Sequence, residues 1–327
     1  MRRSWKLLTG GLAAAALAVG PATMASAAAA TVVSPQNGHG WFFFNEGATG
    51  SGGYTTGPGS PPLGFGSAHL TIDSTGRESF GTAAFKGTRL DAFTTLTYSD
   101  YTPSTSTDHA LVLQFDFDTD LTDADTTYQH RLSSLADGAV VHDVWHAHDA
   151  LADHWYWSSP SADATHCDQA HPCTWAQVKA IWPNGGVRSA PSVPGILLFR
   201  AGGPYAGGLD VSVDAFTVGI SGNNQIFDFE PSGVLSITPA SQSKGGPVSA
   251  QGPGFDPGET VSVKYKTGLS APKAVFLCSA LAQTNGTLTC SGNLPSGAQA
   301  GAKGAHTVVA KGLTSGVKLK GTVTVTK

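Results

Sequence analysis

Apolar and polar residues alternate in many short runs between residues 41 and 230. Alternation places successive side chains on opposite faces and is typical of β-strands with one buried face. Many short strands separated by turn signals favour a β-sandwich over a parallel α/β sheet. We expect strands at the runs WFFFNEG (from residue 41), AHLTID (68), ESFGTAAF (78), TTLTYSD (94), LVLQFDFD (111), VVHDVWHAHDA (140), HWYW (154), ILLFRAGG (196), LDVSVDAFTVGI (209) and IFDFE (226).

Two stretches of this region depart from the strand pattern. The segment GATGSGGYTTGPGSPPLGFGS, from residue 47, is rich in Gly and Pro and predicts a loop. One helix is expected over residues 175–182, because Thr174 and Gln177 form a capping box. The Pro-Asn-Gly-Gly run at 183–186 ends that helix.

A second set of strand patterns follows residue 234, with GFDPGETVSVKYK, HTVVAKG and KLKGTVTVT as its main runs. Charge changes sign at the same place. Residues 28–234 carry 21 acidic and 7 basic residues, whereas residues 235–327 carry 9 lysines and only 2 acidic residues. We therefore predict an all-β chain with an acidic sandwich domain over 28–233 and a basic one over 234–327.

The N-terminus and the cysteines indicate export. Residues 1–27 run from basic residues through an apolar segment to Ala-Ser-Ala, which predicts a signal peptide cleaved after Ala27. No second apolar run reaches membrane length, so we expect no transmembrane segment. Export favours disulfides between the cysteines that lie close in sequence, namely Cys167 with Cys173 and Cys278 with Cys290. Because the second pair flanks Asn285-Gly286, we expect its bridge to staple a hairpin.

Several motifs carry a resemblance to a known group of proteins. They are GPGSPPLGFGSAHLTID, TTLTYSDY, LQFDFDTDLTDADTTYQHRL, PCTWAQVKAIWPNGG, VDAFTVG and FDFEP. Together they resemble secreted actinobacterial proteins whose domain is similar to concanavalin A-like or laminin G-like jelly rolls. GFDPGETVSV resembles the immunoglobulin-like modules of exported bacterial proteins. The resemblance implies a jelly roll followed by an Ig-like module and binding at the cell surface, and it supplies no catalytic residues.

An acidic run follows the strand expected at residues 111–118. The strand should bury Leu113, Phe115 and Phe117 and present the opposite face, where a ligand could lie. Calcium is the candidate ion, since it prefers hard oxygen ligands. The EF-hand pattern fails here, with Leu121 at the glycine position and Thr127 at the glutamate position. The alternative is a solvated acidic loop with turn-forming residues. The candidate ligands are Asp116, Asp118, Asp120, Asp123 and Asp125.

Histidines and tryptophans gather between residues 142 and 182. On one strand His142, His146 and His148 share a face, which suits zinc or copper; His154 lies nearby. Isolated surface histidines are the alternative. Exposed indoles stack on sugar rings, whereas buried ones belong to the core. The candidate carbohydrate-binding residues are Trp145, Trp155 and Trp157.

The lysines of the second domain form same-face pairs on their expected strands. They suit an anionic cell-wall polymer; the alternatives are contact with the acidic first domain, solubility and protection of sheet edges. The candidate residues are Lys264, Lys266, Lys318 and Lys320, with Lys311 nearby. We expect no nucleic-acid partner for an exported protein.

Three functions remain open from the sequence. The first is a secreted, non-enzymatic protein that binds carbohydrate or a cell-surface polymer, stabilised by calcium and associated with the cell wall. The second is a polysaccharide-active enzyme, a glycoside hydrolase or lyase, that uses the carboxylates of the acidic domain. The third is a structural or interaction protein of the cell surface. The E-x-D-x-x-E and G-x-S-x-G motifs do not occur.

Overall fold

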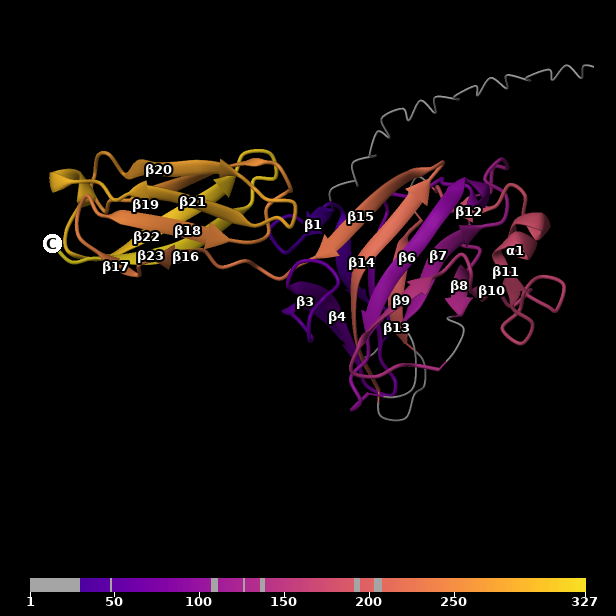
Figure 1. Cartoon of the computed structure of the whole chain (residues 1–327). Helices are drawn as coiled ribbons and strands as arrows, with labels where there is room; N and C mark the ends of the chain where they lie inside the picture. The colour runs from indigo at the N-terminus through magenta and orange to yellow at the C-terminus, as the bar shows by residue number, and fades with distance from the viewer. Residues whose placement is uncertain are drawn as a thin grey trace, which may run out of the picture.

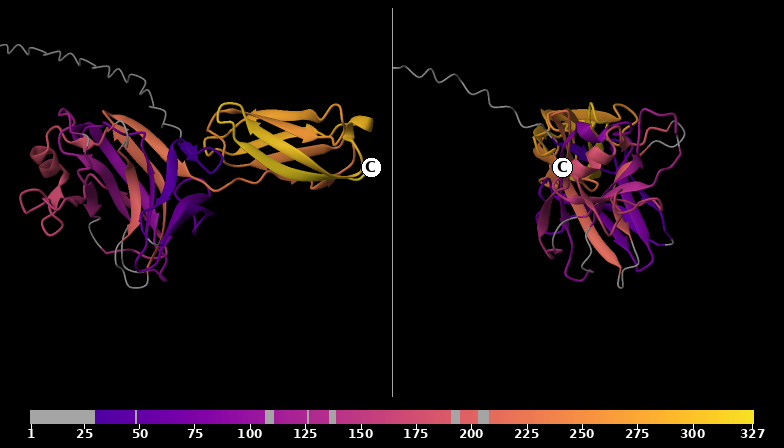
Figure 2. Two further views of the ribbon diagram at one scale, coloured as in Figure 1. Left: turned by 180° about the vertical axis from the view of Figure 1, so that it is seen from behind. Right: turned by 90° about the vertical axis from the view of Figure 1, so that its right-hand side faces the viewer.

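A computed structural model describes residues 30–47, 49–106, 111–125, 127–135, 139–190, 195–202 and 208–327. The predicted signal peptide lies outside these ranges. The described part of the chain is all-β, as predicted, with four sheets arranged as two sandwiches that lie end to end (Figures 1 and 2). Each sandwich has its own set of buried apolar residues, the first drawn from residues 33–229 and the second from residues 235–325.

One sheet of the first sandwich, the β14 sheet, is organised around its longest strand. β14 pairs with β6 on one side; on the other side it pairs first with β4 and then with β15. Its strands are β1 (Thr31–Val33), β3 (Ser51–Thr56), β4 (Gly66–Ile72), β6 (Phe93–Tyr101), β9 (Trp145–Asp149), β14 (Leu209–Ile220) and β15 (Asn223–Phe229).

The facing β7 sheet has the order β11-β10-β8-β7-β13-β5-β2, and β12 also pairs with β7. Its strands are β2 (Trp41–Asn45), β5 (Arg77–Thr82), β7 (Val112–Asp118), β8 (Arg131–Leu135), β10 (His154–Trp157), β11 (Cys173–Thr174), β12 (Gly186–Val187) and β13 (Leu197–Gly202). Aromatic rings fill the space between the two sheets: Trp41 stacks on Phe80 at 5.0 Å and meets Phe216 and Phe229 edge-on.

The second sandwich consists of a three-stranded β18 sheet and a five-stranded β22 sheet. The β18 sheet contains β16 (Ser236–Thr238), β18 (Pro247–Gly252) and β21 (Leu288–Asn293). The β22 sheet contains β17 (Ser241–Gln242), β19 (Thr260–Lys266), β20 (Ala274–Leu281), β22 (Gly304–Gly312) and β23 (Lys318–Val325).

The helix and both disulfides are confirmed. α1 spans Trp175–Ile181, and the Thr174 side chain and Gln177 form the expected capping box. Two short 3₁₀ helices, η1 (Leu90–Ala92) and η2 (Gly297–Ala300), complete the helical elements of the described residues. Among those residues, no helix is long and apolar enough to span a membrane. Cys167 is bonded to Cys173, just before the helix.

The bond between Cys278 and Cys290 does not staple a hairpin, which corrects the sequence prediction. β20 belongs to the β22 sheet and β21 to the β18 sheet, so the bridge joins the two layers of the second sandwich. The predicted Gly/Pro-rich loop is also partly wrong, since Ser51–Thr56 forms β3. β3 pairs with β4 along its whole length, and this long-range pairing compensates for its weak local pattern.

Candidate functional site

Five lysines lie on the outer face of the β22 sheet. Along β19, β22 and β23 buried residues alternate with exposed or half-buried ones, so the lysine side chains point away from the core. These side chains line a depression of about 440 Å³ together with Ser262, Val309 and Leu313. We call this surface the lysine face; it comprises Lys264, Lys266, Lys311, Lys318 and Lys320.

The strand register places like charges next to each other on the lysine face. Lys311 of β22 lies directly opposite Lys318 of β23, and Lys264 and Lys320 flank Val309 on either side. Like charges directly opposite each other destabilise a sheet. Among the residues that the structure describes, none of the five lysines forms an ion pair, so no carboxylate relieves this repulsion.

The two acidic residues of the second sandwich are used elsewhere. Glu259 is buried and accepts hydrogen bonds from the backbone N–H groups of Thr314 and Ser315. Asp256 lies 3.3 Å from His39 of the first sandwich. The residues that line the depression of the lysine face therefore include five cations and no carboxylate.

Asp116 and Asp118 do not lie on an open ligand face, which corrects the prediction from parity. β7 buries Phe115 and Phe117 as expected, but Asp116 and Asp118 are also buried, with exposed fractions of 4% and 5%. The Asp116 carboxylate accepts a hydrogen bond from Nε of Arg131 at 2.9 Å. Burial raises the pKa of Asp118, and nearby carboxylates add to this effect.

The other three acidic residues of the run act as local turn formers. Asp120 accepts hydrogen bonds from the backbone and hydroxyl of Thr122, which lower its pKa, and Asp125 does the same with Thr127. Asp123 accepts from the backbone N–H of Asp125. Within the described residues, no three carboxylates of the run offer oxygens within 4.8 Å of one another. Calcium binding there stays a prediction.

The three candidate tryptophans do not form one platform. Trp155 is fully buried and stacks on Phe115 with 5.3 Å between ring centroids. Trp145 is half-buried and belongs to the β14 sheet, where its indole N–H donates to Pro58. Trp157 is half-buried in the β7 sheet and packs against Trp182. The indoles therefore give no shared surface on which a sugar could stack.

A hollow of about 280 Å³ beside β4 is a candidate active site for the enzyme alternative, and it contains a single carboxylate. His69, Tyr101 and Asp210 are among its lining residues. His69 and Asp210 pair with each other at 2.7 Å. A glycoside hydrolase needs two carboxyl groups flanking the bond it cleaves. The polysaccharide-active enzyme stays a prediction.

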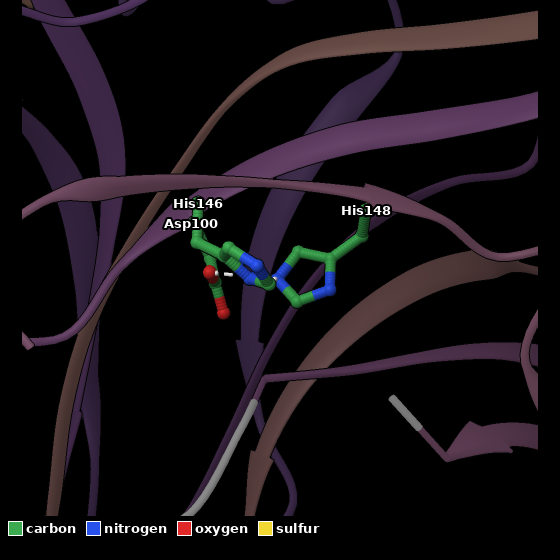
Figure 3. Close-up of side chains that lie close together, drawn as sticks. All are labelled: Asp100, His146 and His148. Carbon is green, nitrogen blue, oxygen red and sulfur yellow. Dashed lines mark hydrogen bonds and ion pairs between the residues drawn. The ribbon is translucent and has the colours of Figure 1, made fainter. Parts of the chain in front are cut away.

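Two of the four candidate histidines converge, and they do so with an aspartate that the sequence analysis did not select. Nε2 of His148 lies 2.9 Å from Oδ1 of Asp100 and 3.2 Å from Nδ1 of His146 (Figure 3). All three ligand atoms lie within 4.8 Å of one another, and no other such group of three occurs in the described part of the chain. Zinc and copper bind donor sets of this kind.

His142 and His154 lie elsewhere, which corrects the predicted face of three imidazoles. Asp143 has a φ of 61°, so the extended backbone is interrupted and β9 begins only at Trp145. The His142 ring contacts the carbonyl of Pro103 instead. His154 belongs to β10 of the facing sheet. The sequence contained one indication of the position of Asp100. In the run TTLTYSDY it lies two residues after Tyr98 and therefore on the same face of the expected strand.

Comparison with known proteins does not identify a family for this chain. No family model matches the chain, and no curated protein matches it. Among solved structures, macromomycin is 17% identical over 29% of this chain and 99% of its own, with a TM-score of 0.23. A similarity at this level carries no information on function.

Proposed function

We propose that the protein is a secreted, non-enzymatic cell-surface protein whose lysine face holds an anionic polymer of the cell wall. The observation that carries this proposal is the gathering of five unpaired lysines on one exposed sheet face. Direct opposition of Lys311 and Lys318 costs stability, and a polyanion bound across the two side chains would offset that cost. The two disulfides and the predicted signal peptide support an extracellular location.

The spacing of the lysine face suits a polymer with repeated anionic groups. Residues two apart on a strand, such as Lys318 and Lys320, lie about 7 Å apart, and neighbouring strands lie about 4.8 Å apart. A flexible chain of phosphodiesters or carboxylates meets several such cations at once. Each exposed ion pair contributes only about 0.2–1 kcal/mol, so useful affinity requires several contacts made together. Val309 and Leu313 add apolar surface beside the charges.

Retention of the full mature chain on purified Gram-positive cell walls tests the proposal. Binding should fall steeply as salt rises from 50 mM to 500 mM, because exposed charges are screened. It should also fall on walls from which phosphodiester polymers have been extracted. A variant with four face lysines changed to glutamine should bind roughly 10- to 100-fold more weakly; the changes are Lys264→Gln, Lys266→Gln, Lys318→Gln and Lys320→Gln.

A charge-matched variant separates the lysine face from net charge. It removes four lysines that do not line the depression and should retain nearly all wall binding. Equal losses in the two variants would contradict a defined face, and binding that ignores salt would contradict the electrostatic account. The control changes are Lys86→Gln, Lys244→Gln, Lys303→Gln and Lys327→Gln.

A further inference from the structure

We propose that Asp100, His146 and His148 bind a divalent transition-metal ion, with zinc as the preferred ion. This site is independent of the lysine face, because it belongs to the first sandwich and serves a different ligand. It rests on the convergence of two imidazoles and one carboxylate from adjacent strands (Figure 3).

Strand register brings the three side chains together. β6 and β9 are antiparallel neighbours, with Asp100 directly opposite His146 and Tyr98 directly opposite His148. Residues two apart on a strand share a face, so Tyr98 and Asp100 lie on the face that also carries His146 and His148. Tyr98 is 1% exposed, which shows that this face is directed into the sandwich. The ligand set is therefore held by a rigid pair of strands, and no loop rearrangement is needed to assemble it.

Hydrogen bonding alone satisfies the group poorly. Nε2 of His148 carries at most one hydrogen, yet it lies within 3.2 Å of both the Asp100 oxygen and the His146 nitrogen. If that hydrogen points to Asp100, the contact with His146 has no hydrogen directed along it. If His146 donates to His148 instead, two lone pairs face each other between His148 and Asp100. A cation among the three atoms removes this conflict, because each atom then donates a lone pair to it.

The distances fit a zinc ion. Zinc binds imidazole nitrogen and carboxylate oxygen at about 2.0–2.2 Å in tetrahedral sites, so neighbouring ligand atoms should lie roughly 3.3 Å apart. The observed contacts of 2.9 Å and 3.2 Å require only a small outward movement. Imidazole is a poor ligand for calcium, which prefers oxygen, and this disfavours calcium here. Three protein ligands leave the fourth position of the tetrahedron for water or another small ligand.

The surroundings hold the ligands in place. The Tyr98 ring stacks on the His148 imidazole with 4.8 Å between centroids and a 19° interplanar angle. The side chains of Asp100 and His148 are each only 9% exposed. Partial burial weakens the competition of water for the ion, so the same three ligands bind more tightly than they would on the surface.

Other pairs of histidine and aspartate show what distinguishes this group. His69 with Asp210, His166 with Asp163 and His171 with Asp168 each join one imidazole to one carboxylate, and their side chains are 27–61% exposed. Each is a simple polar pair at the surface. Only at Asp100, within the described residues, does a second imidazole complete a set of three. His69 and Asp210 lie in the same sheet and therefore provide a matched control.

Zinc titration of the full mature chain, with any affinity tag removed and metals stripped by chelator, tests this inference. We expect one zinc ion per chain by calorimetry and mass spectrometry, and a higher thermal midpoint of the tryptophan-monitored transition. Cobalt should bind with the visible absorption of a site of low coordination number. Asp100→Asn and His146→Gln should each lower zinc affinity by roughly 100-fold or more, because a ligand is lost.

His69→Gln, in the control pair, should bind zinc like the wild type. The wild-type measurements keep the inference testable even if a ligand variant fails to fold. A wild-type chain with no stoichiometric zinc at 100 μM ion and an unchanged midpoint would overturn the proposal. So would a folded His146→Gln variant that binds zinc with unchanged affinity, because it would place the ion elsewhere.

Discussion

Replacing Asp228 with asparagine should make the first sandwich more stable at alkaline pH. Asp228 belongs to three buried carboxyl groups, with Asp214 and Glu230, where β14 changes its neighbour from β4 to β15. At this change of neighbour, carboxylates accept hydrogen bonds from backbone groups that precede β4. Asp214 accepts one from the N–H of Leu63, and Glu230 accepts one from the N–H of Phe65. No positive side chain enters into hydrogen bonds or ion pairs with this trio among the described residues.

The magnitude follows from burial. Burial, with the neighbouring Asp228 charge, raises the pKa of Asp214 from 3.8 to about 7, which corresponds to about 4 kcal/mol. Burial also raises the pKa of Asp228 and Glu230; the Glu230 charge adds to the shift of Asp228, and the Asp214 charge adds to that of Glu230. No donor among the described groups reaches Oδ1 of Asp228 or Oε2 of Glu230. The two carboxyl groups interact directly with each other, so a proton bound by the pair lets one carboxyl donate a hydrogen bond to the other. The folded state thus binds more protons than the unfolded chain between about pH 4 and pH 8.

The trio therefore stabilises the fold in its protonated form, and its contribution is lost as pH rises through these folded pKa values. An asparagine at 228 is neutral at every pH, and its amide can donate to Glu230. We expect Asp228→Asn to match the wild type within about 1 kcal/mol at pH 5 and to exceed it by about 2–4 kcal/mol at pH 8. The wild type should lose more stability than the variant between these two pH values.

Urea unfolding followed by tryptophan fluorescence at pH 5, 6, 7 and 8 measures the effect. The signal reports the first sandwich alone, because residues 234–327 contain no tryptophan. Asp123→Asn, an exposed turn residue that changes the net charge equally, serves as the control and should not alter the pH dependence. A variant that is less stable than the wild type at pH 8, or whose stability has the same pH dependence as the wild type, would show that the buried carboxyl groups do not destabilise the fold when ionised.

Three further changes probe the two cores. Arg131→Met should cost the first sandwich about 3–5 kcal/mol in urea unfolding, because it leaves the buried Asp116 carboxylate without its cation; little or no loss would show that the pair is not needed. Trp155→Ala should cost about 3–5 kcal/mol and Trp145→Ala clearly less, because Trp155 alone is fully buried; the reverse order would contradict the assigned burial. Removing the Cys278–Cys290 bridge should cost the second sandwich about 3 kcal/mol by calorimetry, and an unchanged transition would argue against its role in joining the layers.

Local patterns in the sequence were enough for most elements. Period-two alternation identified the main strands, and Thr174 with Gln177 identified the helix start, because both signals arise within a few residues. β3 was not predicted because its sequence, Ser-Gly-Gly-Tyr-Thr-Thr, lacks an apolar alternation; the strand depends on pairing with β4. The pairing of Cys278 with Cys290 was predicted, but not that their bond joins two layers, because proximity in sequence does not show which sheet each strand joins.

The acidic run shows what the alternation of residues along a strand can and cannot predict. Alternation correctly placed Phe115 and Phe117 in the core, but it described the opposite face only as polar. Whether a polar face is open to a ligand depends on what covers it. Here Arg131 from β8 and Glu46 from the end of β2 form an ion pair across that face and bury Asp116. Arg131 and Glu46 lie 15 or more residues from Asp116 along the chain, so the local pattern around Asp116 could not predict them.

Local periodicity and composition were sufficient to predict an all-β chain, the position of most strands, the two cysteine pairs and the opposite charges of the two halves. The lysine face was partly visible too, since same-face pairs follow from alternation. The grouping of Asp100 with His146 and His148, and the interaction of Asp228 with Asp214 and Glu230, depend on the three-dimensional fold. Strand register and the order of strands in a sheet decide such groupings, and both are set by packing between segments far apart in the chain.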